Sequence, residues 1–150
     1  MDTSKEYVLM CEKAEELQNL WKPAAWDYCY CYANDFEGTP GVIVLSGYET
    51  DMGIYGHSLN FKKYECKAKH IWLPKQDQLQ EMMVKDVEFN VYEIYSEIDD
   101  WLSEITGDSY AYIHYDKIPY SSKEQILLAF VMNETFNKQW NDAEWITITH

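Results

Sequence analysis

Four carboxylates recur on one side of a predicted helix in the second half of the chain. Glu93, Glu97, Asp100 and Glu104 are spaced so that, at about 100° per residue, they fall within roughly a 60° arc, together with Asp86. They rise along the helix axis in steps of about 4.5–6 Å. Anions at such short intervals resemble the phosphates of a nucleic acid. We call Glu93, Glu97, Asp100 and Glu104 the acidic arc.

The sequence around the acidic arc supplies no compensating positive charge. From Asp86 to Asp116 there is no lysine or arginine. Like charges at i,i+4 each cost a few tenths of a kcal/mol, so helix stability alone would favour lysine at some of these positions. Three explanations stay open: a solvated face, a row of phosphate surrogates for the basic groove of a nucleic-acid-binding protein, or a docking face for another basic partner.

Other acids would enlarge this surface if the fold placed them beside it. Asp108 follows the predicted helix and is counted with the acidic arc as a candidate partner-binding residue. Glu12, Glu15 and Glu16 lie on a separate predicted helix. They belong to the surface only if that helix lies next to the acidic one.

The cysteines and histidines predict neither a metal site nor a catalytic one. Cys29, Cys31, Cys66 and His70 are the ligand types of a zinc site. On one strand, however, Cys66 and His70 would lie roughly 13 Å apart, which is too far for one ion. We expect reduced thiols instead, because disulfides are rare in the cytosol. No HExxH motif, nucleophile elbow, Walker loop or GxGxxG occurs, so we expect no cofactor and no enzymatic activity.

Alternating aromatic residues mark a second candidate surface. In Trp26–Tyr32, strand geometry places Tyr28, Tyr30 and Tyr32 on one face and the two cysteines on the other. Packing of these tyrosines against a helix is the simpler interpretation. An aromatic patch that binds another protein is the alternative, because tyrosine and tryptophan are favoured interface anchors.

Composition limits the classes of function. The 150 residues carry a net charge of −14, which is opposite to the basic face of a nucleic-acid binder and disfavours anionic membranes. No apolar run approaches the roughly 18–20 residues that span a bilayer. The first residues lack a basic and an apolar segment of the secretory type, so we expect a cytoplasmic protein.

Periodicity predicts an α+β fold of one domain, residues 1–150. Three main helices are expected to pack an antiparallel sheet of three to four strands, and the last helix should be central because it is apolar nearly all round. The predicted helices cover residues 4–21, 86–105 and 122–137, with a short one after Pro74. The predicted strands cover 26–32, 41–48 and 61–73, and the segment 109–115 is expected to be a short strand or an ordered loop.

Two blocks resemble a family of small proteins from phages and prophages of low-GC Gram-positive bacteria. They are HIWLPKQDQLQEMM (His70–Met83) and YSSKEQILLAFVMNETFNKQWNDAEWI (Tyr120–Ile146). The resemblance covers under a third of the chain and implies a fold and a phage setting, but no catalytic residues. The acidic arc lies outside both blocks.

Together these features predict a phage-encoded inhibitor of a host nucleic-acid-handling defence enzyme, of the CRISPR or restriction nuclease type. Its acidic surface would occupy the enzyme's basic groove in the host cytoplasm, without contacting nucleic acid or membrane itself. The alternative is a phage accessory or assembly protein that binds partners through the aromatic patch. The sequence indicates no oligomeric state.

Overall fold

The computed structural model describes residues 1–32, 40–50, 53–58, 63–66, 70–83, 91–108 and 115–149. Side chains are described for these residues except 46–50, 53–58, 63–66, 91 and 115. The helices in this part of the chain are α1 (Lys5–Lys13), α2 (Glu15–Leu20), α3 (Gln76–Met83), α4 (Val91–Thr106), the 3₁₀ helix η1 (Tyr115–Lys117) and α5 (Lys123–Phe136). The strands are β1 (Tyr28–Cys31), β2 (Gly41–Thr50), β3 (Gly53–Ser58), β4 (Lys63–Cys66), β5 (His70–Leu73), β6 (Lys138–Trp140) and β7 (Trp145–Thr147).

The main sheet is antiparallel, in the order β4-β3-β2-β1-β5, and β6 and β7 form a separate hairpin. The predicted α+β class with an antiparallel sheet is therefore confirmed. The sheet has five strands in the described residues rather than three to four. β3 was not among the predicted strands, and the segment 61–73, predicted as one strand, contributes both β4 and β5, which lie at opposite edges. The predicted element at 109–115 falls almost entirely outside the described residues.

The two faces of β1 belong to different clusters. Cys29 and Cys31 are buried in a small cluster with Ile43 and Leu45 on one face of the sheet. On the other face, Tyr28 and Tyr30 are half-buried against the main core, which the helices build. The predicted alternation and the packing of these tyrosines against helical residues are thus confirmed.

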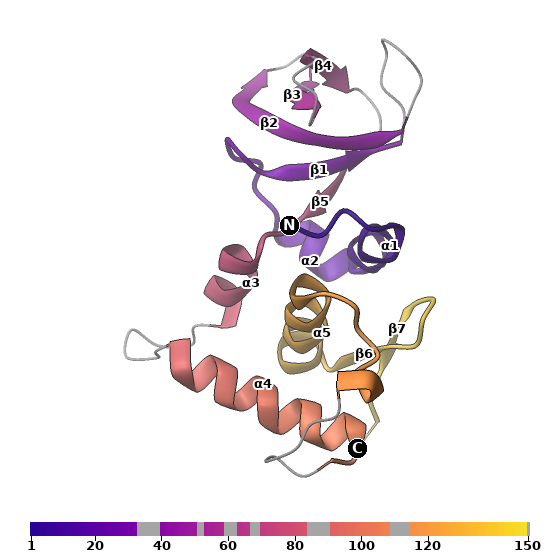
Figure 1. The fold of residues 1–150 in the computed structure, drawn as a ribbon. Helices are drawn as coiled ribbons and strands as arrows, with labels where there is room; N and C mark the ends of the chain where they lie inside the picture. Colours follow the sequence, from indigo (N-terminus) through magenta and orange to yellow (C-terminus); the bar gives the residue numbers. More distant parts are fainter. Residues whose placement is uncertain are drawn as a thin grey trace.

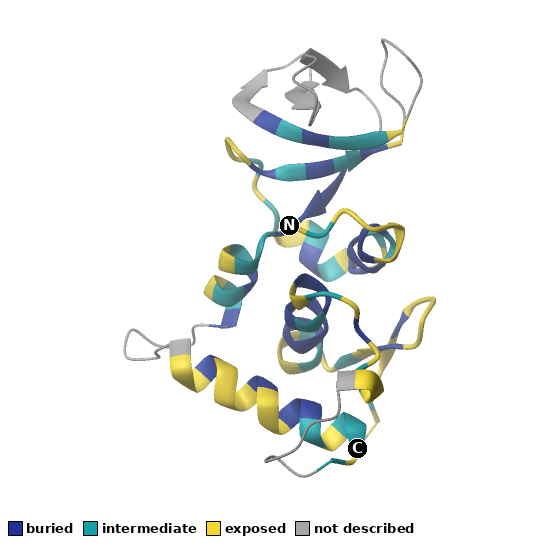
Figure 2. Cartoon of the chain, viewed as in Figure 1, coloured by how far each residue is buried: buried dark blue, intermediate teal, exposed yellow. Residues whose placement is uncertain are grey.

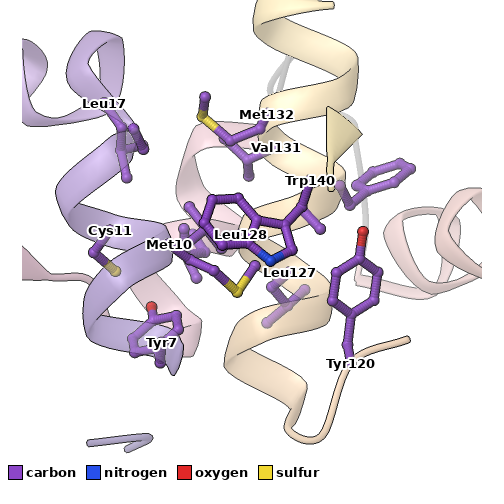
Figure 3. Close-up of a cluster of buried hydrophobic side chains, with 14 of the residues drawn as sticks. Tyr7, Met10, Cys11, Leu17, Tyr120, Leu127, Leu128, Val131, Met132 and Trp140 are labelled. Atoms are coloured by element: carbon purple, nitrogen blue, oxygen red, sulfur yellow. The ribbon is translucent and has the colours of Figure 1, made fainter. Parts of the chain in front are cut away.

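The main core lies where α1 and α2 meet α5. Figure 3 shows Tyr7 and Met10 from α1 facing Leu128 and Met132 from α5, with Trp140 of β6 beside them. Helix α5 begins at the cap Ser122, whose hydroxyl accepts from the Gln125 backbone, and it is buried through most of its length. In Figure 1, α5 lies between α1 and α4, below the sheet. Its predicted central position is confirmed.

The first predicted helix is divided at Ala14, and a glutamine explains the division. Ala14 leaves helical geometry (ψ 65°), and the carbonyl of Cys11 accepts from the Ala14 backbone N–H at 3.2 Å and from the Gln18 side-chain amide at 3.0 Å. The same amide donates to the Trp72 carbonyl at 3.0 Å and accepts from the Trp72 backbone N–H at 2.8 Å. Gln18 therefore occupies the outer edge of β5 as a neighbouring strand would, and this protects an exposed edge from pairing with another chain.

The cysteines are not all reduced. Cys11 and Cys29 are buried free thiols, as predicted. Cys31 is disulfide-bonded, so the prediction of a reduced thiol is wrong at this position. Burial raises the pKa values of the Cys11 and Cys29 thiols, which makes both of them poor nucleophiles near neutral pH.

Candidate functional site

Helix α4 is held to the protein by one narrow apolar face. Ile94, Ile98, Trp101 and Leu102 are buried, and the helix packs against α5. The Trp101 ring stacks on Tyr120 at a centroid distance of 6.0 Å and meets Phe130 edge-on at 5.5 Å. The helix ends at Gly107, which adopts the left-handed conformation that glycine tolerates best. This face fixes the direction in which every other side chain of α4 points.

The acidic arc lies on the exposed side of α4. Glu93, Glu97, Asp100 and Glu104 are all exposed, and Figure 2 shows α4 exposed along most of its length. No residue of α4 is a lysine or arginine. The structure thus brings these four predicted residues onto one solvent-facing strip, about 16 Å long from Glu93 to Glu104 at a rise of 1.5 Å per residue. Asp86, which shares the arc in sequence, lies outside the described residues.

Asp108 does not extend this strip, so its prediction as a partner-binding residue is corrected. Its side chain is only 8% exposed and forms an ion pair with Lys117 from η1. A carboxylate that is already paired and largely buried offers little charge to a partner. Lys117 lies nine residues after Asp108 and reaches back to it only through the fold.

The acids of α1 and α2 are also separate from the acidic arc. In Figure 1, α5 lies between α4 and the two N-terminal helices that carry Glu12, Glu15 and Glu16. Glu16 forms an ion pair with Lys138 of β6, and this contact lowers the pKa of its carboxyl. Glu12 accepts a hydrogen bond of 2.5 Å from the Tyr32 hydroxyl. These acids therefore belong to a different surface.

Helix α4 also exposes two tyrosines outside the acidic arc, a feature that the sequence analysis missed. Tyr92 is 86% exposed and Tyr95 is 41% exposed. The Tyr95 hydroxyl accepts a hydrogen bond of 3.0 Å from the Gln80 side chain of α3. In helical projection both tyrosines fall outside the acidic arc and outside the apolar face of α4. This position was the sign in the sequence that they would be exposed. Exposed tyrosine beside carboxylates is suited to a protein interface.

The predicted aromatic patch on β1 is mostly covered. Tyr28 and Tyr30 pack against the core, while Tyr32 is 42% exposed. The hydrogen bond from Tyr32 to Glu12, together with partial burial, raises the pKa of Tyr32 to about 12. Tyr32 is therefore the main accessible ring of this set.

The other chemical groups do not converge. Among the residues that the structure describes, no three histidine, cysteine, aspartate or glutamate side chains are arranged to hold a metal ion. Burial lowers the pKa of His70, so this ring is neutral at pH 7. The side chain of Cys66, the remaining ligand considered for zinc, lies outside the described part.

The chain matches no protein-family model, no curated protein and no solved structure. The resemblance to phage proteins thus stays a prediction. Within the described residues, no helix has the length and apolarity needed to cross a membrane.

Proposed function

We propose that this chain is a binding protein whose acidic arc occupies the basic nucleic-acid groove of another protein and so inhibits it. In the phage setting that the sequence suggests, the partner is a cytoplasmic defence enzyme of the host, of the CRISPR or restriction nuclease type. The observation that carries the proposal is the continuous exposed strip of carboxylates on α4, with no lysine or arginine in the helix.

The dimensions of the strip agree with those of a phosphate backbone. Its four carboxylates span about 16 Å, a length over which one strand of B-DNA presents about five phosphates at 3.4 Å of axial rise. Binding by such a strip neutralises lysines and arginines that otherwise contact phosphate. The attraction between exposed charges weakens as salt rises, because the Debye length falls from about 10 Å at 0.1 M to 3 Å at 1 M.

The exposed Tyr92 of α4 favours a protein partner over a solvated face with no function. It is 86% exposed and lies about 100° around the helix from Glu93, the next residue. A rigid ring beside the charges supplies apolar contact area, whereas the carboxylates supply steering and orientation.

The test is a tagged pull-down from a Gram-positive host lysate that expresses its defence systems, eluted along a salt gradient. The matched variants are Glu97→Lys/Glu104→Lys, within the acidic arc, and Asp99→Lys/Glu144→Lys, at exposed acids outside it. Both change the net charge equally. We expect a nucleic-acid enzyme to be retained by the wild type and the control, to elute at moderate salt, and to be lost with the arc variant.

The recovered enzyme is then assayed for cleavage or binding of its nucleic acid. Inhibition by the wild type that added nucleic acid relieves competitively, and that the arc variant lacks, supports the proposal. Retention that depends on neither salt nor the arc variant contradicts it. Equal loss with both variants also contradicts it, because net charge rather than the acidic arc would then be responsible.

A further inference from the structure

A pocket away from the acidic arc combines aromatic walls with a buried carboxylate. It has a volume of about 270 Å³ and lies between the segment that follows α2, strand β5 and helix α3. The rings of Trp21 and Trp72 are nearly parallel, at an interplanar angle of 4° and a centroid distance of 6.1 Å. Asp27 also lines the pocket, and Glu81 contributes a second carboxylate from its exposed position on α3.

Asp27 is deeply buried, and within the described residues it has no positive partner. It is only 2% exposed. Its Oδ2 accepts from the Trp21 indole N–H at 2.8 Å and from the Ala24 backbone at 2.9 Å, while Oδ1 accepts from the Gln78 side chain at 2.6 Å. In the described part of the chain, none of the ion pairs involves this carboxylate. A carboxylate can accept about four hydrogen bonds, so one acceptor position remains, on Oδ1.

These properties favour a cation with planar donors. Burying a carboxylate without a counter-charge is unfavourable, and a cation in the pocket would relieve that cost. Tryptophan faces attract cations, and the flat guanidinium of arginine stacks on them better than a lysine ammonium does. Lys22 also lines the pocket, but it is exposed and forms no ion pair with Asp27 or Glu81.

The surroundings indicate that the cation belongs to a protein segment. The pocket is slightly smaller than the roughly 300–1,000 Å³ typical of small-molecule sites, and it suits one inserted side chain. Leu20 at its rim is 59% exposed, and Trp26, next to Asp27, is 73% exposed.

We propose that this pocket binds an arginine side chain presented by a protein partner, with Asp27 accepting from the guanidinium and the tryptophans contacting its face. Because none of these residues belongs to α4, this inference does not depend on the proposed function. It predicts a second, chemically specific contact that would hold even for a partner without a nucleic-acid groove.

The experiment titrates the ¹⁵N-labelled protein with the peptide acetyl-Gly-Arg-Gly-amide and follows the indole N–H resonances. The Trp21 indole N–H is the reporter, because it donates to Asp27. We expect the Trp21 and Trp72 signals to shift saturably. The matched peptide with citrulline, a neutral isostere of arginine, should produce at least tenfold weaker binding. Equal binding of the citrulline or a leucine peptide, or no shift with arginine, would overturn the proposal.

Charge variants at the rim of the pocket test the proposal further, because they leave the buried carboxylate of Asp27 unchanged. Glu81→Gln should weaken binding of the arginine peptide about two- to fivefold, and Lys22→Glu should strengthen it by a similar factor, as expected for exposed charge pairs. Asp27→Asn should abolish binding in a protein whose spectrum shows it folded. The variant Glu97→Lys/Glu104→Lys should bind the peptide as the wild type does. Unchanged affinity in both rim variants contradicts the proposal, whatever the outcome for the acidic arc.

Discussion

The carboxylates of the acidic arc and the carboxylate of Asp27 occupy opposite environments. Glu97, Asp100 and Glu104 are exposed on one face of α4, where water solvates them. Asp27 is 2% exposed and receives three hydrogen bonds from three separate positions of the chain. The first group is accessible to a partner, whereas Asp27 joins the segment after α2 to helix α3.

This difference shows that acidic residues in one protein need separate explanations. A row of exposed like charges slightly weakens its own helix, so its presence on α4 calls for a reason outside the fold. A buried acid with three donors has a structural reason, because those donors would otherwise lack an acceptor. A functional role for Asp27 therefore rests on the remaining acceptor position and on the pocket around it.

The largest effect is expected for Asp27→Ala. The change leaves the Trp21 indole, the Ala24 backbone and the Gln78 amide without their acceptor, so we expect a loss of about 2–4 kcal/mol in the free energy of unfolding. Glu97→Ala, at an exposed acid, is the control and should change it by less than about 0.5 kcal/mol. Urea denaturation followed by tryptophan fluorescence measures both. Similar losses of unfolding free energy in the two variants would contradict the distinction between the buried and the exposed carboxylate.

The sequence predicts the local elements better than the contacts between them. Apolar periodicity located α4, because a helix repeats its buried face every three to four residues, whereas α5 was located by a run that is apolar nearly all round. Hydrogen bonds between distant segments were not predictable in this way. Gln18 and Trp72 are 54 positions apart, and Asp27 and Gln78 are 51 apart. Nothing in the local sequence marks these pairs, and only the tertiary fold brings them together.

The same limit explains which parts of the candidate site could be predicted from the sequence. The acidic arc lies at a large angle from the apolar face of α4. Its exposure could therefore be predicted from the sequence of this one helix. The pairing of Asp108 with Lys117, and the separation of α4 from the acids of α1 and α2, depend on tertiary structure. Those parts of the predicted surface were accordingly the ones that needed correction.

Glu16, half-buried and paired with Lys138, should give an intermediate effect that depends on pH. The ion pair lowers the pKa of the Glu16 carboxyl below its ordinary value of 4.5. A carboxyl whose pKa is lower in the folded state stabilises the fold at pH values above 4.5, and this contribution is lost as the pH falls through the folded-state pKa. Glu16→Gln should therefore destabilise the protein at pH 7, by less than about 1 kcal/mol, and this destabilisation should shrink as the pH falls from 4.5 towards 3. Thermal denaturation of both proteins across this range measures the difference. A difference in stability that is equal at both pH values would show that the charge of Glu16 is not its cause.

The smallest effect, and the one with opposite sign, is expected on α4. In Glu97→Lys/Glu104→Lys, each new lysine lies three or four positions from a remaining acid, Glu93 or Asp100, so repulsive pairs become attractive ones. We expect the free energy of unfolding to increase by about 0.5–1 kcal/mol at low salt, and the gain to shrink at 1 M salt. Circular dichroism melts of the variant and wild type at both salt concentrations provide the measurement. A stabilised variant that no longer retains a partner would show that the acidic arc is kept at the expense of helix stability. A destabilised variant would instead mean that these carboxylates support the fold, and the contrast with Asp27 would fail.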